Sequence, residues 1–427
     1  MLKINSDNPA IEKNVRQMHK MITDMDGWID PNVLITSEGG NLSIEMDGFA
    51  DPRNPLMAVP EELLMPTEKM NISVEGDDLV MSPKDGALTK EQTEMGDVFL
   101  GLYNLTKKIP LNRESCCWLK YRGNMKPLNE LLKARTITGQ TKDLHAFATG
   151  TTSESLADIE AMTYVKTRTI GLKGVVGTEN DDMQTYLMPI IDFVNHHPDG
   201  SNFGLSDNEK KTGKARFVSI MDARPVPNSN ECYAYYNQMD TLDAFVNYGF
   251  PDSNANFVRS MPLNIDLGEA GSLAVQSASY GMIKQRLHKS VAGLRPYIPT
   301  TLRNDNEGIE VSHLAIPVTE DAPNALRRVL RMLISNRSAR IFNTEQVWEY
   351  VVAAEKTIVE SNIDFYKNLI AKAHKNIEKG EEGWDMILDI GNIQYNKLLK
   401  YQFEANYFEK EPVFEAPDKE KRSIKAA

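Results

Sequence analysis

Short apolar runs separated by turn residues characterise the early part of the chain, from about residue 31 to residue 66. Residues 33–36 (Val-Leu-Ile-Thr) are rich in β-branched side chains, and residues 38–41 (Glu-Gly-Gly-Asn) are typical of a turn. Residues 56–60 form a second apolar run that ends at Pro60. The pattern predicts short strands joined by tight turns, with 56–60 as a buried strand.

Helical spacing replaces this pattern between residues 61 and 175. Apolar side chains recur three and four positions apart in two stretches: Val98, Leu102 and Leu105, then Leu128, Leu131 and Leu132. Ser153 is a candidate N-cap for a further helix that runs toward Thr167. This segment is therefore predicted to be mostly helical.

The strand pattern returns at residues 186–194, 215–220 and 231–236. The first of these is an apolar strand that delivers Asn195 and His196 at its end, and the third alternates tyrosines with small residues. A capped short helix is predicted next, and it ends in the turn Tyr248-Gly249-Phe250. Its apolar face is formed by Leu242, Phe245 and Val246.

From about residue 255 the pattern predicts helices again, with an irregular, proline-containing connection at 295–323. Residues 321–323 (Asp-Ala-Pro) favour a helix start, and Asn343 with Gln346 forms a possible capping box. A last helix is predicted at roughly 384–406. The apolar stripes of these helices are interpreted as packing surfaces, among them Leu326, Val329, Leu330, Leu333 and Ile334.

The composition is that of a globular protein of two or three domains, because 427 residues with 41% hydrophobic and 25% charged side chains can build a sizeable core. A net charge of −12 argues against nucleic acid as a partner and suits a basic protein segment, although it also simply keeps a protein soluble. No apolar run is long enough to span a membrane, and the N-terminus lacks the apolar core of a secretory signal. We therefore expect a cytoplasmic protein with no membrane partner, and a monomer.

Three cysteines are too few and too poorly spaced for a zinc site, and no metal is expected. Cys116 and Cys117 are adjacent, and Cys232 is distant from both, so reduced, buried thiols are the expectation. His196 and His197 are unlikely to share a metal, because neighbouring side chains on a turn point apart and no further ligand spacing completes a site.

The order of these motifs resembles the catalytic half of SET-domain methyltransferases, specifically the Rubisco large-subunit lysine methyltransferase branch. Pro189, Asp192, Asn195 and His196 match a Pro-x-x-Asp-x-x-Asn-His pattern, and the tyrosine strand is followed by the turn at 248–250. The resemblance spans roughly residues 25–410 and is strong only in 164–257.

The resemblance implies an α+β protein: a β-rich SET fold interrupted by a helical insert and followed by an all-α C-terminal domain. The implied division places the N-terminal part of the SET domain at 1–95, the insert at 96–175 and the catalytic part at 176–260. A helical domain of the substrate-binding type would cover 261–410, and 411–427 would be a flexible tail. Trp118, in a stretch that resembles a Ser-x-Trp-x-x-Tyr motif of the insert, is expected to pack.

The implied reaction transfers a methyl group from S-adenosyl-L-methionine to a lysine side chain of a protein. The acceptor amine must be neutral and aligned with the methyl group, and burial beside a positive charge favours loss of its proton. A narrow channel lined with carbonyls and a tyrosine hydroxyl suits this task, because these groups are dipoles without competing charge.

Residue roles are carried over from the family onto matching positions. Arg168 is expected to hold the carboxylate of the cofactor, and Asn195, His196 and Phe250 to contact other parts of it. Tyr236 and Tyr248 are the expected catalytic tyrosines. The substrate channel would include Thr167, through its backbone carbonyl, together with Asp192 and Tyr235.

Two positions compete for the catalytic tyrosine, because Tyr235 and Tyr236 point to opposite faces of a strand and only one can enter a pocket. Counting back from Tyr248 without a gap selects Tyr235, whereas the strand pattern selects Tyr236. Tyr236 is the preferred assignment.

The N-terminal part of the cofactor site departs from the family pattern. The family has a Gly-x-Gly-Leu type of turn, and the best match here is residues 45–50, which retain Gly48, followed by Phe49. Gly39-Gly40 could instead be the turn. The departure either leaves the site intact or weakens cofactor binding.

Three alternatives to a lysine methyltransferase follow. A related branch methylates histidine, so the acceptor is open. A SET-derived binding module that has lost catalysis is motivated by the altered glycine turn. An unrelated hydrolase that uses His196 or His197 as a base lacks support, since no Gly-x-Ser-x-Gly motif occurs.

Overall fold

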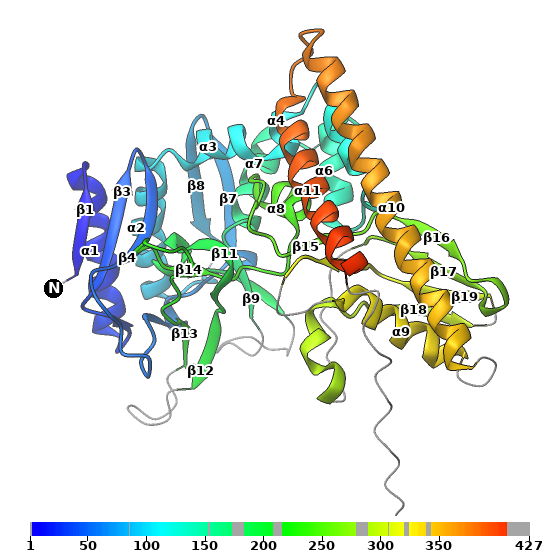
Figure 1. The fold of residues 1–427 in the computed structure, drawn as a ribbon. Helices are drawn as coiled ribbons and strands as arrows, with labels where there is room; N and C mark the ends of the chain where they lie inside the picture. The colour runs from blue at the N-terminus through cyan, green and yellow to red at the C-terminus, as the bar shows by residue number, and fades with distance from the viewer. Residues whose placement is uncertain are drawn as a thin grey trace, which may run out of the picture.

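The computed structural model describes residues 2–84, 86–152, 154–172, 183–207, 216–278, 289–305, 307–319, 324–338 and 343–407. The fold is mixed α+β, as expected. A strand-rich part lies at the left of Figure 1, and helices α10 and α11 run side by side at the upper right. A smaller sheet lies below them.

The N-terminal layer packs one helix on a three-stranded sheet of order β1-β3-β4. The sheet is built from β1 (Lys3–Ser6), β3 (Val33–Glu38) and β4 (Asn41–Met46), and the helix is α1 (Pro9–Asp24). Asn8 caps α1 by accepting a hydrogen bond from the backbone N–H of Ala10. The β3–β4 hairpin confirms the strand and turn predicted for residues 33–41.

Short strands make up the middle of the strand-rich part. One sheet has the order β12-β13-β5-β2 and another the order β6-β10-β9. A hairpin (β7 and β8) and a parallel pair (β11 and β14) complete it. Their bounds are β2 (Trp28–Ile29), β5 (Met57–Pro60), β6 (Met65–Pro66), β7 (Met70–Glu75), β8 (Asp78–Pro83), β9 (Thr169–Leu172), β10 (Gln184–Leu187), β11 (Asn195–Ser201), β12 (Gly204–Asp207), β13 (Arg216–Ile220) and β14 (Tyr233–Ala234).

Two of the predicted strands around the motifs are corrected by the structure. The expected strand at 186–194 ends at Leu187, because Pro189 cannot donate to a ladder and Ile190 has a positive φ of 62°. A short 3-10 helix follows (Ile191–Phe193), so Asn195 and His196 begin a strand instead of ending one. The strand expected at 231–236 is limited to Tyr233–Ala234.

Helices fill the segment between Lys90 and Lys166, as predicted. They are α2 (Lys90–Leu105), α3 (Lys108–Ser115), α4 (Cys117–Lys120), α5 (Lys126–Leu132), α6 (Gln140–Ala148) and α7 (Leu156–Lys166). Thr89 and Gln92 form a capping box at the start of α2. Ser153 lies outside the described residues, and the side chain that caps α7 is Ser155.

The C-terminal region contains a sheet that the sequence pattern did not predict. Its order is β16-β17-β19-β18, and a separate pair joins β15 to β20. The bounds are β15 (Phe257–Arg259), β16 (Leu263–Asp266), β17 (Ser272–Val275), β18 (Thr301–Asp305), β19 (Gly308–Val311) and β20 (Ala315–Pro317). The helices expected from about residue 255 are therefore wrong for residues 257–275, and β18 to β20 lie in the connection that was expected to be irregular. The physical reason is that strands of three to five residues show too few alternations for a clear period.

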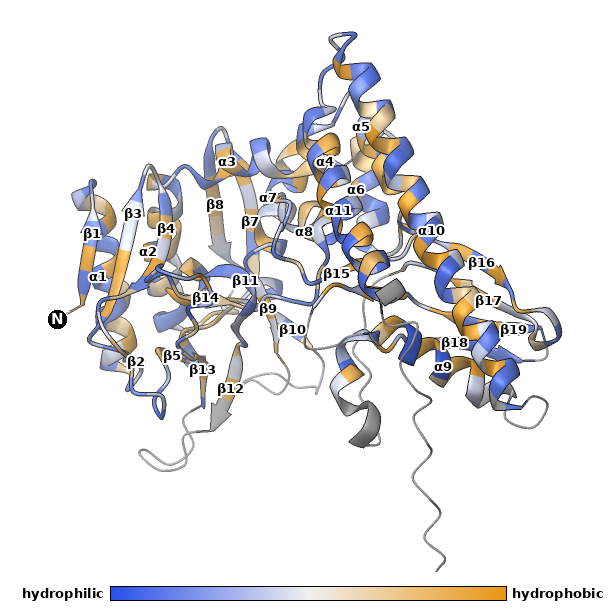
Figure 2. Ribbon diagram, viewed as in Figure 1, coloured by the Kyte–Doolittle hydropathy of each residue, from blue (hydrophilic) through white to orange (hydrophobic). Residues whose placement is uncertain are grey.

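The helical region itself is present and begins later than predicted. It consists of α9 (Ala325–Ser338), α10 (Thr344–Ile377) and α11 (Asp385–Tyr407). The capping box of Asn343 and Gln346 is confirmed, whereas the helix start predicted at 321–323 lies outside the described residues, as does the tail from 408. Figure 2 shows apolar and polar positions interleaved along α10 and α11.

Two hydrophobic cores hold these parts together, and the helical segment from Lys90 to Lys166 contributes to both. One core joins α2 and α7 to the N-terminal strands, through side chains such as Phe99, Tyr103 and Tyr164. The other joins α4, α5 and α6 to α8 (Thr241–Tyr248) and the C-terminal helices. Trp118, expected to pack, is fully buried in this second core, and its indole N–H donates to the carbonyl of Val246. The domain boundaries at residues 95, 175 and 260 stay predictions.

Candidate functional site

Aromatic rings from two other segments, residues 235–236 and 248–250, gather around the imidazole of His196. The centroid of the His196 ring lies 5.2 Å from that of Tyr236, 6.3 Å from that of Tyr235 and 6.2 Å from that of Phe250. Tyr248 completes the group, with its ring 5.4 Å from Tyr236 and 6.2 Å from Phe250. The two motif segments predicted to meet therefore do so in space.

Helix α8 delivers Tyr248 and Phe250 to this group. Asp240 caps the helix by accepting from the backbone N–H of Asp243, and Gly249 ends it with φ of 83°. A Cβ at position 249 would lie 2.6 Å from the carbonyl oxygen of Ser115. Only glycine fits here, both for its backbone conformation and for the closeness of the insert.

His196 is buried and its tautomer is defined by its neighbours. Its Nδ1 accepts a hydrogen bond from the backbone N–H of Tyr236 at 3.2 Å, and its Nε2 lies 3.7 Å from Oδ2 of Asp252. Burial lowers the pKa of His196, and the Asp252 carboxylate opposes this only in part. The neutral ring with its proton on Nε2 satisfies both contacts.

Tyr236, and not Tyr235, faces a pocket. The hydroxyl of Tyr236 donates to the carbonyl oxygen of Val194 at 2.6 Å, and burial, followed by the nearby Asp192, raises the pKa of Tyr236. Burial also raises the pKa of Tyr235, to about 12, but that ring does not line the pocket. The placement agrees with the preferred assignment of Tyr236, whose catalytic role stays a prediction.

The pocket has a volume of about 130 Å³ and collects five of the predicted residues. They are Thr167, Arg168, Asp192, Tyr236 and Tyr248, with Phe203 as a further aromatic wall. Arg168 and Thr167 come from the end of α7, and Asp192 from the short 3-10 helix. A channel with a cation, a carboxylate and two phenols is thus built from segments far apart in the sequence.

The guanidinium of Arg168 lies against two aromatic rings and is incompletely paired. Its central carbon is 5.7 Å from the ring of Tyr103 and 5.4 Å from that of Tyr164. Its Nη1 lies 3.3 Å from Oδ2 of Asp192, while its Nε is buried and has no hydrogen-bond partner among the described residues. Burial raises the pKa of Asp192 well above its usual range, despite the contact with Arg168.

Lys108 is a candidate functional residue that the sequence reasoning missed. It is the first residue of α3, only 9% of it is exposed, and it has no hydrogen bond or ion pair with any described residue. Burial lowers the pKa of Lys108 to about 7, and the charge of Arg168 adds to the effect. The pair Lys107-Lys108 looks like an exposed basic dipeptide in the sequence, so no local signal could have identified it.

Gly48 and Phe49 do not line the pocket. Phe49 is 87% exposed, and Arg224 packs over its ring and donates to the carbonyl of Gly48. Asn195 lies at the same edge of the molecule: its amide donates to Glu231, which bridges to Glu45 on β4. The Gly39-Gly40 alternative forms the tip of the β3–β4 hairpin, with both residues at positive φ.

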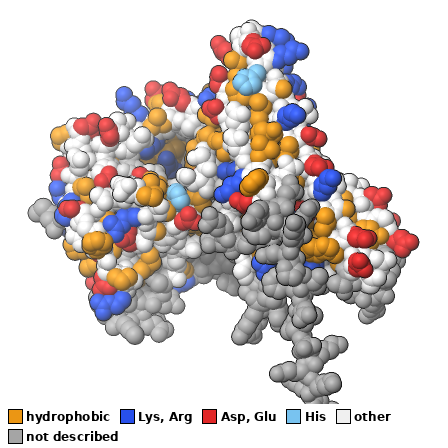
Figure 3. All heavy atoms as spheres, in the orientation of Figure 1, with side chains coloured by type: hydrophobic (Ala, Val, Ile, Leu, Met, Phe, Trp, Pro, Cys, Tyr) orange, Lys and Arg blue, Asp and Glu red, His pale blue; other side chains and the backbone are white. Residues whose placement is uncertain are grey.

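The surface near the site is mixed in charge. On the face drawn in Figure 3, acidic and basic side chains are interspersed, and a hollow partly lined by Lys or Arg lies between the strand-rich part and the helices. Among the described residues no group of three or more His, Cys, Asp and Glu side chains could hold a metal ion. No helix within those residues has the length and apolar character needed to cross a membrane.

Comparison with known proteins gives matches among solved structures alone. The chain matches no protein-family model and no curated protein. It is similar to the SET domain of LSMT bound to lysine and AdoHcy, with 12% identity, a TM-score of 0.40 and coverage of 93% of this chain and 91% of that one. It is also similar to Rubisco LSMT bound to AdoMet, with 12% identity, a TM-score of 0.35 and coverage of 92% and 91%. TM-scores below 0.5 at this identity do not establish a shared function, so the function is argued below from the residues of this chain.

Proposed function

We propose that this protein is an S-adenosyl-L-methionine-dependent methyltransferase of the SET type that acts on a lysine side chain of a protein. The observation that carries the proposal is the pocket itself. Arg168, Asp192, Tyr236 and Tyr248 come from four segments, and they line one small cavity beside His196. This is the combination of an anion holder and a phenol-lined channel that the sequence motifs imply.

The residues around Arg168 fit the carboxylate of such a cofactor. Arg168 has a buried, unpaired Nε, and Lys108 is a buried cation without a partner among the described residues. Lys108 feels the charge of Arg168, and Arg168 is paired with Asp192, so an anionic group bound there would balance the positive charge of the two basic residues. We therefore propose that Arg168, with help from Lys108, holds the carboxylate of the cofactor, which when bound supplies the electrophilic methyl group.

The same environment favours the neutral form of an acceptor amine. The same forces act on Lys108, because burial and the nearby charge of Arg168 lower its pKa to about 7. An acceptor lysine that enters the cavity between Tyr236 and Tyr248 would lose water and face the same cation, so its pKa would fall in the same direction. Tyr236 is held by Val194, so its ring is already oriented before the substrate arrives.

The protein partner is proposed to present a basic segment, because the chain carries a net charge of −12. Histidine is the alternative acceptor. A catalytically inactive binding module is the alternative of another class, and it is favoured by the exposed position of Phe49, away from the pocket.

The first experiment separates the enzyme from the inactive module. S-adenosylhomocysteine is added to the pure protein and thermal unfolding is followed, with adenosine as the matched control that lacks the carboxylate. The proposal predicts a rise in the unfolding midpoint with S-adenosylhomocysteine and a smaller rise with adenosine. No shift with either compound would contradict it.

The second experiment tests the reaction. The protein is incubated with methyl-labelled cofactor and an extract of cells of its source, and the labelled band is hydrolysed for amino-acid analysis. Label in methyl-lysine supports the proposal, and label in methyl-histidine selects the alternative acceptor. Cofactor binding without any labelled product favours the binding module.

A further inference from the structure

The C-terminal helix α11 contacts both ends of the segment that carries Tyr248 and Phe250. Lys397 donates from Nζ to the hydroxyl of Thr241, the first residue of α8, at 2.9 Å. Thr241 in turn donates to the backbone carbonyl of Asp252 at 2.7 Å, and Nζ of Lys397 lies 3.5 Å from the same carbonyl. One lysine therefore ties the start of α8 to the loop that follows the aromatic turn.

Asp252 continues this chain of contacts into the site. Its Oδ1 accepts from the backbone N–H of Asn254, which fixes the carboxylate, and its Oδ2 faces Nε2 of His196 at 3.7 Å. Oδ2 is buried and makes no hydrogen bond with a described residue, so the imidazole is the group it faces. Nδ1 of His196 then accepts a hydrogen bond from the backbone N–H of Tyr236.

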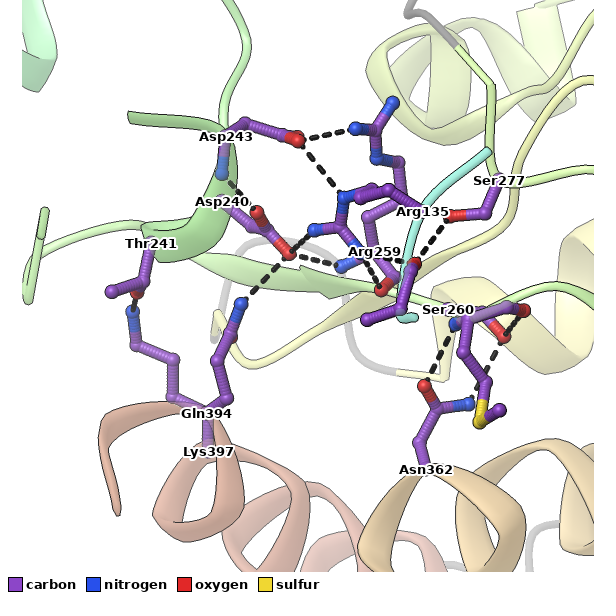
Figure 4. A network of polar contacts seen from close by, with 12 residues as sticks. Arg135, Asp240, Thr241, Asp243, Arg259, Ser260, Ser277, Asn362, Gln394 and Lys397 are labelled. Carbon is purple, nitrogen blue, oxygen red and sulfur yellow. Dashed lines mark hydrogen bonds and ion pairs between the residues drawn. The ribbon is translucent and has the colours of Figure 1, made fainter. Parts of the chain in front are cut away.

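A second residue of the same helix strengthens the anchor. The amide of Gln394 donates to Oδ2 of Asp240, the N-cap of α8, at 2.8 Å, and Figure 4 shows Gln394 and Lys397 reaching α8 from one helix. Burial lowers the pKa of Lys397 to about 8, against the opposing effect of Asp240 and Asp252. The hydrogen bonds of Lys397 offset part of this desolvation, whereas an apolar residue at this position would carry no such penalty and would make no such contacts.

We propose that Lys397 is a positioning residue of the active site: through Thr241 and Asp252 it sets His196, and through His196 the main chain at Tyr236. The C-terminal helical region is then part of the catalytic framework and not only a surface that grips the protein substrate. This inference deepens the proposed function. Only the expected effect on methyl transfer rests on that function, and the positioning of His196 and Tyr236 does not.

The structural test does not require activity. Backbone amide hydrogen exchange is measured by NMR or mass spectrometry in Lys397→Met and in Lys400→Met, which removes a lysine from the next turn of α11. Lys400 is exposed and contacts only the Val318 carbonyl and Glu404 among described residues, so it is a matched control. In Lys397→Met the amide of Tyr236 should exchange about tenfold faster, the factor for one lost hydrogen bond, and in Lys400→Met it should not change.

A purely stabilising role gives a different result. If exchange accelerates uniformly across all protected amides of Lys397→Met, or if the Tyr236 amide is unchanged, the proposal is overturned. Lys397→Arg keeps a cationic donor and should restore most of the protection of the Tyr236 amide. Asp252→Asn should speed hydrogen exchange of the Tyr236 amide although Lys397 is intact. These outcomes hold whether or not the protein transfers methyl groups.

The catalytic test applies once methyl transfer is detected. Lys397→Met should then lower turnover by about tenfold or more, because small displacements of reacting groups are costly, while the KM for cofactor stays near that of the wild type. A change confined to the KM for the protein substrate would overturn the proposal, since Lys397 would then act by gripping the partner. Absence of methyl transfer in the wild type counts against the proposed function and leaves the exchange result standing.

Discussion

The fold contains two clusters of arginine and aspartate whose hydrogen bonding differs. Behind α8, Arg135 and Arg259 meet Asp240 and Asp243 (Figure 4). In the pocket, Arg168 meets Asp192 alone, at 3.3 Å. The side-chain types are the same, and the number of partners decides what each cluster can do.

The cluster behind α8 is densely bonded. Oδ2 of Asp240 accepts from Arg135, from the amide of Gln394 and from the backbone N–H of Arg259, at 2.6, 2.8 and 2.8 Å. Burial alone would raise the pKa of Asp240, but the two arginines outweigh it and bring that pKa to about 2. This cluster joins the end of α5, the start of α8, β15 and α11, so it is structural.

The pocket pair is sparsely bonded. Arg168 keeps an unpaired Nε, Lys108 has no partner among the described residues, and burial raises the pKa of Asp192. Polar groups that are buried and unpaired cost stability, and such groups concentrate where a ligand is bound. The cluster behind α8 also holds buried atoms without a hydrogen-bond partner among the described residues, such as Oδ2 of Asp243, so unpaired atoms alone do not identify a site. The pocket pair differs because Arg168 and Asp192 line a cavity that a ligand can enter.

The largest effect is expected from breaking the cluster behind α8. Arg135→Met removes one cation and leaves two buried carboxylates underpaired, which should lower the free energy of unfolding by about 3–5 kcal/mol. Chemical denaturation measures the change, with Arg53→Met as a control that should leave the midpoint in place, because the Arg53 side chain is 87% exposed and its ion pair with Asp51 lies at the surface. If Arg135→Met lowers the free energy of unfolding only slightly, water or a rearrangement of nearby side chains must supply new hydrogen bonds to the carboxylates.

The next effect concerns the tyrosine in the pocket. Tyr236→Phe removes the hydroxyl that contacts Val194 and should reduce methyl transfer by about 10²-fold, the typical cost of deleting one oriented polar group at a reacting centre. Cofactor affinity should stay nearly intact. Tyr235→Phe is the matched control, and a larger loss for Tyr235→Phe than for Tyr236→Phe would reverse the assignment.

A change at Arg168 tests the role of the arginine–aspartate pair in the pocket. Arg168→Ala should weaken cofactor binding by roughly 10- to 100-fold, because a hydrogen bond to a charged group contributes about 1.5–3 kcal/mol. Isothermal titration with S-adenosylhomocysteine measures it, and Arg303→Ala on distant β18 should bind as wild type does. Equal affinities for Arg168→Ala and wild type would remove Arg168 from the cofactor site.

Lys108 gives a smaller, pH-dependent effect. Burial brings its pKa to about 7 in the folded protein, against 10.5 for an ordinary lysine, so between these pH values the unfolded chain binds more protons and stability rises with pH. Lys108→Met removes this dependence, which amounts to about 1.4 kcal/mol per pH unit at most. The variant should therefore be more stable than wild type at pH 7, with the gap narrowing toward pH 10.

The same variant should bind S-adenosylhomocysteine less tightly at pH 7. A gain in stability together with a loss of affinity is the result expected of a residue kept for function. Thermal unfolding across this pH range, with and without the ligand, measures both quantities. If Lys108→Met is less stable than wild type at pH 7, the buried lysine does not destabilise the fold. The argument that the pocket carries unbalanced positive charge is then wrong.

Much of the local structure was predictable from neighbouring residues. The capping box at Asn343, the apolar stripe of α9 and the aromatic turn after α8 depend on interactions within a few positions of the chain. The strands between 257 and 317 escaped prediction because each is short and finds its partner in another segment, as β17 does with β19 across more than thirty residues. The end of the strand at Leu187 needed the backbone conformation of Ile190, which the sequence pattern did not reveal.

The sequence by itself determined the order of the Asn-His, tyrosine and Tyr-Gly-Phe segments, and the helical periods around them. Only the tertiary structure decided which tyrosine faces the pocket, that Phe49 stays exposed, and that Lys108 is buried beside Arg168. The physical reason is one of range. Periodicity and capping act over a few residues, whereas burial, and with it the pKa and pairing of a charged group, is set by every segment that packs around it.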